Sequence, residues 1–182
     1  TNGHLLAELA QPLADAGLRR VNVSLDTLDP QTFAKITRLG DVGRVLRGLS
    51  AARAAGLGPV KINAVVLRGV NDEQVADLLD YAAAEGHVLR FIEYMPIGVD
   101  DYWGPDSFVP HAEIRERLAE RWDVRPAVGR PTVGGGPAAQ YVADRRDGGF
   151  SDVPLGFISA MSHNFCASCN RVRLSATGTL RE

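Results

Sequence analysis

Hydrophobic residues in this chain alternate between helical and strand-like spacing. Four leucines at helical spacing open the chain, and their pattern ends at Gly17: Leu5, Leu6, Leu9 and Leu13. Residues 20–25 then read as a strand. The opening of the chain therefore predicts a helix followed by a strand.

The same alternation continues through the next seventy residues. Asp29-Pro30 is typical of the start of a short helix, and a longer helix around residues 42–49 ends at Gly56. Strands are predicted at 60–67 and 88–93, separated by a helix that Asn71 or Asp72 can cap. Because each strand follows a helix, we expect the three strands to be parallel.

The C-terminal half has a less regular pattern. After Met95 the composition shifts toward loop residues, which we expect to cross the mouth of a barrel. A helix carrying Ile114, Leu118 and Trp122 follows, then a weak linker over residues 126–139. Short strands are predicted at 140–142, 156–160 and 172–175.

Polar residues interrupt the three predicted parallel strands, although strands covered on both sides are usually continuous apolar runs. Strict alternation gives one polar face: Asn22, Ser24, Asp26, Lys61, Asn63, and Glu93 and Met95 on the same face as Phe91. A solvated or edge face is the simpler alternative for any single strand. Three such strands together favour a polar cavity, as at the carboxyl ends of barrel strands, and alternation places Arg90 on the opposite face from Met95.

The composition limits the classes of function. With 182 residues, 45% of them hydrophobic, the chain can form a sizeable core, and a net charge of −2 argues against wholesale nucleic-acid binding. Two closely spaced cysteines favour a reducing cytoplasm over a secreted disulfide scaffold. No run approaches the roughly 18 apolar residues of a membrane span, so we expect no membrane association.

Both cysteines lie in one segment, which also carries two arginines. Cys166 and Cys169 have the spacing of ligands for a soft metal or an iron–sulfur cluster, and Arg171 and Arg173 suit phosphate or carboxylate oxygens. A redox pair or inert thiols are the alternatives. His163 does not complete a zinc site, because no second ligand pair lies at a finger-like distance.

Neither common nucleotide-binding loop is supported. Residues 134–139 satisfy G-x-G-x-x-A, but Pro137 lies inside the match and a predicted strand follows it, whereas a dinucleotide fingerprint follows a strand and opens a helix. No G-x-x-x-x-G-K-[ST] phosphate loop occurs. A nucleotide would therefore be bound in another way.

Five motifs in fixed order, covering essentially the whole chain, resemble one family. They are Thr1-Asn2-Gly3, the strand at 21–29, the strand at 60–63, the strand at 90–96 and the segment 165–173. The chain resembles the GTP 3′,8-cyclases, radical S-adenosylmethionine enzymes that begin molybdenum cofactor biosynthesis. The resemblance implies an α/β fold: part of an incomplete (β/α)6 TIM-like barrel plus a C-terminal extension whose short strands carry the CxxC segment.

The resemblance also implies roles for individual residues. Ser24 and Met95 match residues that bind S-adenosylmethionine. Lys61, Arg171, Arg173 and the backbone at Val172 match a GTP site, to which Arg90 is added more weakly. Cys166 and Cys169 match two ligands of a substrate-side 4Fe-4S cluster. The implied enzyme uses two 4Fe-4S clusters and converts GTP to (8S)-3′,8-cyclo-7,8-dihydroguanosine 5′-triphosphate.

The chain departs from that family in two places. The C-x3-C-x2-C run that holds the radical-generating cluster is missing, and a third ligand of the substrate-side cluster would fall beyond Glu182. We therefore expect a fragment, inactive by itself, with no catalytic residue of its own, comprising half of a barrel over residues 1–98 and a truncated cluster- and GTP-binding region over 99–182. For the parent we expect a cytoplasmic homodimer with an unidentified electron donor.

Two other hypotheses stay open. In one, the chain is a non-catalytic anion-binding module in which Cys166 and Cys169 form a redox pair or half of a zinc site. In the other, it is a different radical S-adenosylmethionine enzyme with a C-terminal cluster, which would not bind GTP.

Overall fold

A computed structural model describes residues 1–95, 104–129, 137–163 and 173–181. The helices of the described residues are α1 (Leu6–Asp15), α2 (Pro30–Thr37), α3 (Val42–Ala54), α4 (Val75–Glu85) and α5 (His111–Leu118), with short 3-10 turns at Asp72–Gln74 and Pro105–Ser107. The strands are β1 (Asn22–Ser24), β2 (Lys61–Val66), β3 (Val88–Glu93), β4 (Trp122–Pro126), β5 (Ala139–Arg145), β6 (Val153–Ile158), β7 (Arg173–Leu174) and β8 (Leu180–Arg181).

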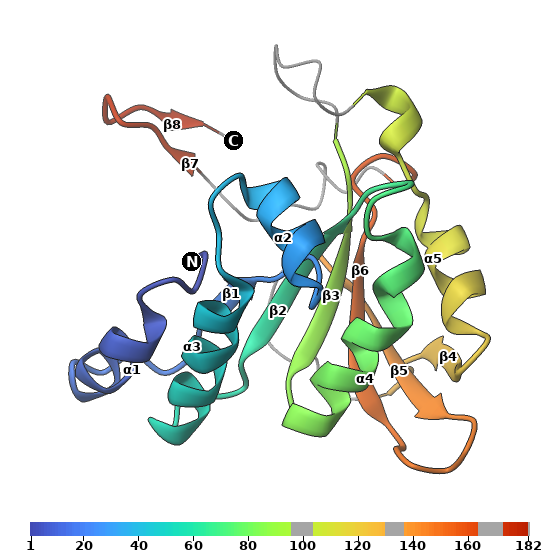
Figure 1. The fold of residues 1–182 in the computed structure, drawn as a ribbon, viewed down its shortest axis with the longest axis horizontal. Coiled ribbons are helices and arrows are strands. Elements are labelled where there is room, and N and C mark those ends of the chain that lie inside the picture. The colour runs from blue at the N-terminus through green and yellow to red at the C-terminus, as the bar shows by residue number, and fades with distance from the viewer. Residues whose placement is uncertain (96–103, 130–136, 164–172, 182) are drawn as a thin grey trace.

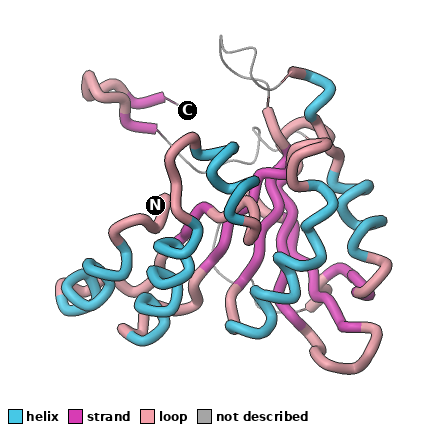
Figure 2. Tube along the Cα trace, in the orientation of Figure 1, coloured by secondary structure: helices cyan, strands magenta, loops and turns pink. Residues whose placement is uncertain are grey.

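Six of these strands form one mixed sheet, in the order β1-β2-β3-β6-β5-β4. β1, β2, β3 and β6 are parallel neighbours, which confirms the parallel arrangement predicted for the first three, while β5 and β4 run antiparallel. Figure 1 shows α3 and α4 in front of this sheet, with the β7–β8 hairpin apart from it, and the tube in Figure 2 shows the same layering. The fold is therefore α/β, with helices gathered on one visible face of the parallel strands.

Local side-chain chemistry determines where the helices begin and end. The Asp29 carboxylate accepts a hydrogen bond from the Thr32 amide at 2.7 Å, and Pro30 occupies the first turn of α2, as the sequence predicted. Asp41 caps α3 in the same way through the Gly43 amide. α4 ends at Gly86, whose φ of 68° is left-handed, a conformation that glycine adopts without strain.

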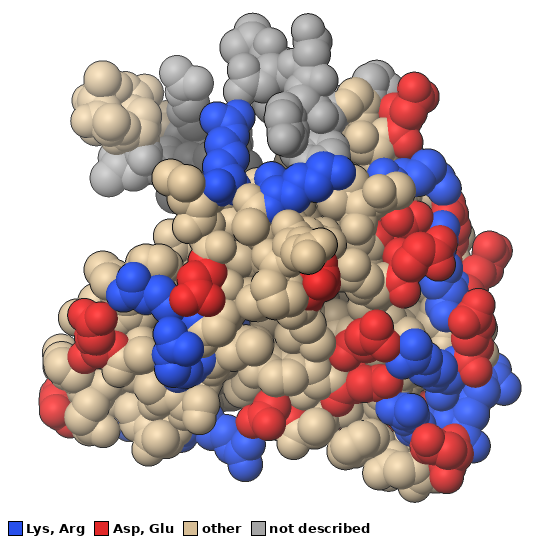
Figure 3. All heavy atoms as spheres, in the orientation of Figure 1, with Lys and Arg blue, Asp and Glu red and all other residues tan. Residues whose placement is uncertain are grey.

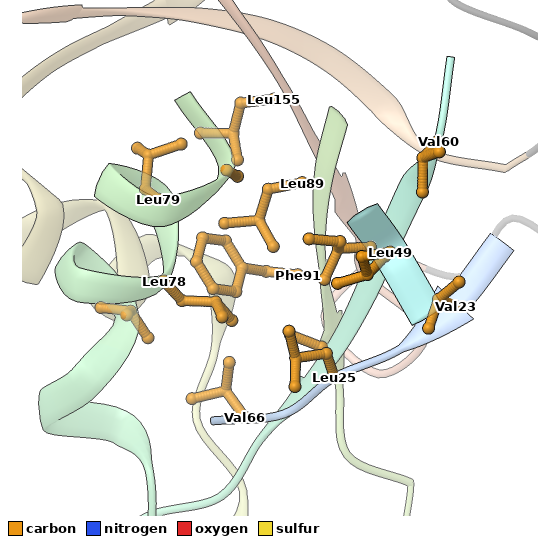
Figure 4. Close-up of a cluster of buried hydrophobic side chains, with 14 of the residues drawn as sticks. Val23, Leu25, Leu49, Val60, Val66, Leu78, Leu79, Leu89, Phe91 and Leu155 are labelled. Carbon is orange, nitrogen blue, oxygen red and sulfur yellow. The ribbon is translucent and has the colours of Figure 1, made fainter. Parts of the chain in front are cut away.

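The core lies between the parallel strands and the helices (Figure 4). Val23, Ile62 and Leu89 are paired across β1, β2 and β3, and all three are fully buried. Leu49 of α3 and Leu79 of α4 pack over this side of the sheet, also fully buried. Every second residue of each strand thus points toward the helices and supplies the apolar face that they cover.

The packing of α1 differs from what a leucine stripe suggests. Leu6 and Ala10 face the core, whereas Leu5, Leu9 and Leu13 are 51%, 45% and 36% exposed. α1 packs closely on α3 at Gly48, where an added Cβ would lie 2.8 Å from the Gly3 carbonyl oxygen and 3.0 Å from Leu6 Cβ. Gly48 therefore allows the Leu6 side of α1 to pack closely on α3.

Trp122 was predicted on the helical stripe of α5, and this is wrong. α5 ends at Leu118, and Trp122 begins β4, a strand that the sequence pattern did not predict. The indole is fully buried, and its Nε1–H donates to Asp80 of α4 at 2.8 Å. The hydrophobicity of Trp122 fits a helix or a strand, and the pairing of residues 122–126 with β5 makes this segment a strand.

Alternating charges cover the outer surface of α4 and α5, at the right of Figure 3. Arg117 pairs with Asp72 and Glu113, and Arg121 pairs with Asp77 and Asp80. Such surface pairs each stabilise a fold by about 0–1 kcal/mol, so this network contributes less than the core. No helix among the described residues is long and apolar enough to cross a membrane.

We predict that Leu49→Ala lowers the free energy of unfolding by about 2–5 kcal/mol, because the side chain is fully buried and its removal leaves a cavity. Leu9→Ala, on the exposed side of α1, should change it by less than about 0.5 kcal/mol. Urea unfolding of the two variants tests this packing. Equal losses in both would show that Leu9 is buried in solution.

Candidate functional site

The face of the sheet opposite the core carries a row of polar residues. Ser24, Asn63 and Arg90 are paired across β1, β2 and β3, and Gly156 of β6 continues the row. Paired residues of neighbouring strands point to the same side of a sheet, so these residues share one face. Lys61 lies two residues before Asn63 on β2, on the same face, and is paired with Asn22 of β1. The predicted polar face therefore exists, and we call Ser24, Asn63, Arg90 and Lys61 the polar row.

Arg90 belongs to this face, and the placement of Glu93 predicted from alternation is wrong. The register pairs Arg90 with Asn63, whereas Glu93 is paired with the buried Val66 of the core side. Alternation divides the residues of each strand between two faces but does not relate one strand to the next. Only the pairing between strands determines which residues of β2 and β3 share a face. Met95 lies beyond the end of β3 and is 37% exposed, so strand alternation does not place it.

Both cations of the polar row are enclosed by protein. Arg90 is only 2% exposed and Lys61 only 5%. Gly156 makes room for Arg90: a Cβ at Gly156 would lie 3.2 Å from Arg90 Cγ. A side chain at position 156 would crowd Arg90 by a few tenths of an ångström, so glycine suits this close approach, as a glycine inside a strand pattern can indicate.

Asn63 gives the row an unsatisfied acceptor. Its Oδ1 atom is buried and has no hydrogen-bond partner in the structure. A buried carbonyl oxygen without a donor costs free energy, and buried polar groups left unpaired in this way are uncommon in native proteins. With the adjacent hydroxyl, ammonium and guanidinium, the row offers donors and an acceptor to a polar, anionic molecule.

A second set of buried polar groups holds the carboxyl ends of β1 and β2 together. Asp26 accepts from the Val65 amide at 2.8 Å, and Asn71 donates to the carbonyl oxygens of Asp26 and Val65 at 2.8 and 2.9 Å. Asn71 also accepts from the Leu67 amide at 2.7 Å. The helix cap predicted at Asn71 or Asp72 is therefore wrong: Asn71 clamps two strands, and a 3-10 turn precedes α4.

Burial raises the pKa of Asp26, although the hydrogen bond from Val65 works in the other direction. A single amide donor does not offset the loss of hydration of this carboxylate. Asp26 was predicted on the polar face but was not assigned a role. The clamp that it forms with Asn71 carries no sequence signal beyond two polar residues near strand ends.

The predicted cluster ligands Cys166 and Cys169, and the predicted GTP contacts Arg171 and Val172, lie outside the described residues. Arg173 opens β7, which pairs with β8. Among the described residues, no group of three or more His, Cys, Asp and Glu side chains could hold a metal ion. The structure therefore places Ser24, Lys61 and Arg90 on one face of the sheet. The binding roles of all the predicted site residues stay predictions.

Comparison with known proteins assigns the two halves of the chain to known families. Residues 87–182 match the family described as Molybdenum Cofactor Synthesis C, and residues 1–82 match the Radical SAM superfamily. The first match covers more than half of the chain. The chain belongs to the Molybdenum Cofactor Synthesis C family. β3 and β6 lie in the segment that matches Molybdenum Cofactor Synthesis C, whereas β1 and β2 lie in the segment that matches the Radical SAM superfamily.

Curated proteins that are similar to this chain carry the name GTP 3′,8-cyclase. The protein from Rhodopseudomonas palustris strain TIE-1 is 50% identical over 180 residues, which is 99% of this chain and 50% of the relative. Relatives of the same name from Bradyrhizobium diazoefficiens and Paracoccus denitrificans are 47% and 46% identical, again over 99% of this chain and 50% of each relative. The chain spans about half the length of these curated relatives.

We predict that Asp26→Asn makes stability less dependent on pH. The folded-state pKa of Asp26 is raised above its ordinary value of 3.8, so the wild type loses stability relative to the variant as pH rises from 3.8 through the folded-state pKa. Asparagine keeps an oxygen for the Val65 amide. Urea unfolding of both proteins between about pH 3.5 and 7.5 measures the difference. A constant difference would contradict the raised pKa.

Proposed function

We propose that the protein containing this chain is a GTP 3′,8-cyclase, a radical S-adenosylmethionine enzyme of the first step of molybdenum cofactor biosynthesis. The observation that carries the proposal is the polar row, in which two enclosed cations lie beside a hydroxyl and an unsatisfied amide oxygen on one sheet face. The identity of 46–50% to proteins of that name supports it.

In this proposal the parallel strands β1, β2, β3 and β6 are part of an incomplete (β/α)6 barrel, and the polar row lines its interior. Ser24 and Met95 hold S-adenosylmethionine at the carboxyl edge of the sheet. Cys166 and Cys169 hold one 4Fe-4S cluster. The division into a barrel half, residues 1–98, and a cluster- and GTP-binding region, residues 99–182, belongs to the same proposal.

The clusters and S-adenosylmethionine, when bound, supply the radical that removes a hydrogen atom from the GTP ribose, after which C3′ of the ribose joins C8 of guanine. The residues of this chain bind and orient the reactants. Lys61, Arg90, Arg171 and Arg173, with the backbone of Val172, offset the triphosphate charge. Enclosure of Lys61 and Arg90 keeps water away from the charges, which strengthens their interaction with phosphate oxygens.

The proposed parent enzyme is a cytoplasmic homodimer that receives electrons from a donor not yet identified. The alternative of a non-catalytic module with a redox or zinc-binding CxxC predicts a different metal content. Both hypotheses can be separated on the complete gene product that contains these 182 residues.

We expect that gene product, reconstituted anaerobically with iron and sulfide, to form 5′-deoxyadenosine and a cyclised GTP product only when both GTP and S-adenosylmethionine are present. Chromatography with mass detection measures both products. Zinc as the sole bound metal, with no brown chromophore, would support the binding module instead. Formation of 5′-deoxyadenosine without any dependence on GTP would indicate a radical enzyme of another substrate class.

We predict that Lys61→Met raises the dissociation constant for GTP by about 10- to 100-fold, because a charge-assisted hydrogen bond contributes roughly 1.5–3 kcal/mol. Arg47→Met is the matched control: it removes one positive charge from the outer side of α3, where the side chain is 66% exposed. Isothermal titration should show less than about a twofold change for this control. Equal weakening in both variants would mean that net charge, not Lys61, determines affinity.

A further inference from the structure

Glu93, the last residue of β3, lies on the core side of the sheet, and its side chain is only 1% exposed. Its Oε1 atom accepts from the His111 amide at 3.0 Å and from the Ser162 hydroxyl. Its Oε2 atom accepts from the amides of Met161 and Ser162 at 3.0 and 2.9 Å. A carboxylate has about four acceptor sites, so these four donors satisfy it.

The donors come from two segments that are distant in sequence from β3. His111 is the first residue of α5, whose N-cap, Pro110, provides no side-chain cap. An uncapped helix start has free amides and favours a negative charge, which Glu93 supplies. Met161 and Ser162 belong to the turn that follows β6. Glu93 thus joins β3, α5 and this turn, and we call residues 159–163 the stem.

The hydrogen bonds also explain the charge of Glu93. Burial alone would raise the pKa of this carboxyl, but the hydrogen bonds from Ser162, His111 and Met161 outweigh burial and lower it. The charged form is therefore favoured, as expected of a carboxylate that accepts several backbone amides. Asp26, with one such donor, shows the opposite shift.

His111 and Ser159 complete the contact between α5 and the stem. Ser159 Oγ lies 2.6 Å from His111 Nδ1, and the His111 ring faces Phe157 and His163 with centroid distances of 5.6 and 5.7 Å. Burial lowers the pKa of His111, which favours a neutral ring that shares a hydrogen bond with the serine hydroxyl through Nδ1.

This cluster is not a catalytic triad, although it contains serine, histidine and glutamate. Glu93 Oε1 is 3.7 Å from His111 Nδ1, the same nitrogen that contacts Ser159. A proton relay needs the carboxylate and the hydroxyl on opposite ring nitrogens. The geometry supports holding the stem in place, not activating a nucleophile.

We propose that Glu93 is a positioning residue that anchors the stem to β3, and so sets where the chain that follows His163 departs from the sheet. β3 also carries Arg90 of the polar row, three residues before Glu93. One strand therefore holds the row on one face and the stem on the other. The inference deepens the proposed function, on which its link to GTP rests, because the segment after the stem carries Cys166, Cys169, Arg171 and Arg173.

The test compares Glu93→Gln with Glu113→Gln. Glutamine is of similar size, but its amide nitrogen cannot accept from the stem amides, so donors are left unpaired. Glu113 is the matched control, because it is a carboxylate of α5 that pairs with Arg68 and Arg117 and does not contact the stem. Ser162→Ala is a milder second variant, which removes one of the four donors and leaves the carboxylate in place.

We expect Glu93→Gln to speed hydrogen exchange of the Met161 and Ser162 amides at least about tenfold and to raise the GTP dissociation constant by a similar factor. Ser162→Ala should shift both in the same direction by less, and Glu113→Gln should change neither. Unchanged exchange in both stem variants would overturn the proposal. So would faster exchange with unchanged GTP affinity, because the stem would then have no effect on the site.

A double-mutant cycle separates positioning from general destabilisation. If Glu93 acts through the segment after the stem, the losses in GTP affinity from Glu93→Gln and Arg173→Ala should be non-additive, whereas those from Glu93→Gln and Lys61→Met should add. Additivity in both cycles would overturn positioning. Absence of GTP binding by the wild type would contradict the proposed function, and amide exchange would still decide whether Glu93 anchors the stem.

Discussion

The parallel register of β1, β2 and β3 is the constraint on which the rest of the structure depends. Successive strand residues point to opposite faces, so a shift of one residue in a single strand would move its polar side chains into the core. The observed register places Ser24, Asn63 and Arg90 on one face, and Val23, Ile62 and Leu89 on the other. Helix packing and the polar row therefore require the same alignment.

Buried hydrogen bonds at the carboxyl ends of the strands support this alignment. Asn71 contacts the backbone of both β2 and the chain that follows β1, and Asp26 bonds to the Val65 amide. At the end of β3, the Glu93 carboxylate accepts hydrogen bonds from backbone amides of α5 and of the stem. Asp26 accepts from one amide, whereas Glu93 accepts from four donors. Burial therefore prevails at Asp26 and raises its pKa, whereas the hydrogen bonds prevail at Glu93 and lower its pKa.

The two matched segments of the chain meet within one continuous sheet. β2 belongs to the Radical SAM match, and β3 belongs to the Molybdenum Cofactor Synthesis C match, yet these strands are paired along their whole length. β6 then pairs with the other edge of β3. β3 thus carries Arg90 of the polar row on one face and Glu93, which holds the stem, on the other.

Much of this organisation could be predicted from local sequence. Hydrophobic spacing located β2, β3, α3 and α4, and Asp29-Pro30 located the start of α2, because these signals depend on near neighbours in the chain. The motifs around Ser24, Lys61 and the cysteine pair indicated a family, and the comparisons confirmed that resemblance.

Contacts between distant residues decided the rest. Strand pairing places Arg90 in the polar row and Glu93 on the opposite face, and the close contact at Gly48 brings the Leu6 side of α1 against α3. Trp122 begins a strand because residues 122–126 pair with β5, which the local pattern does not reveal. The sequence by itself determined which residues alternate and which chemistry the chain carries. Only the tertiary structure decided which face each residue shares, because hydrogen bonding between strands aligns residues that no local pattern relates.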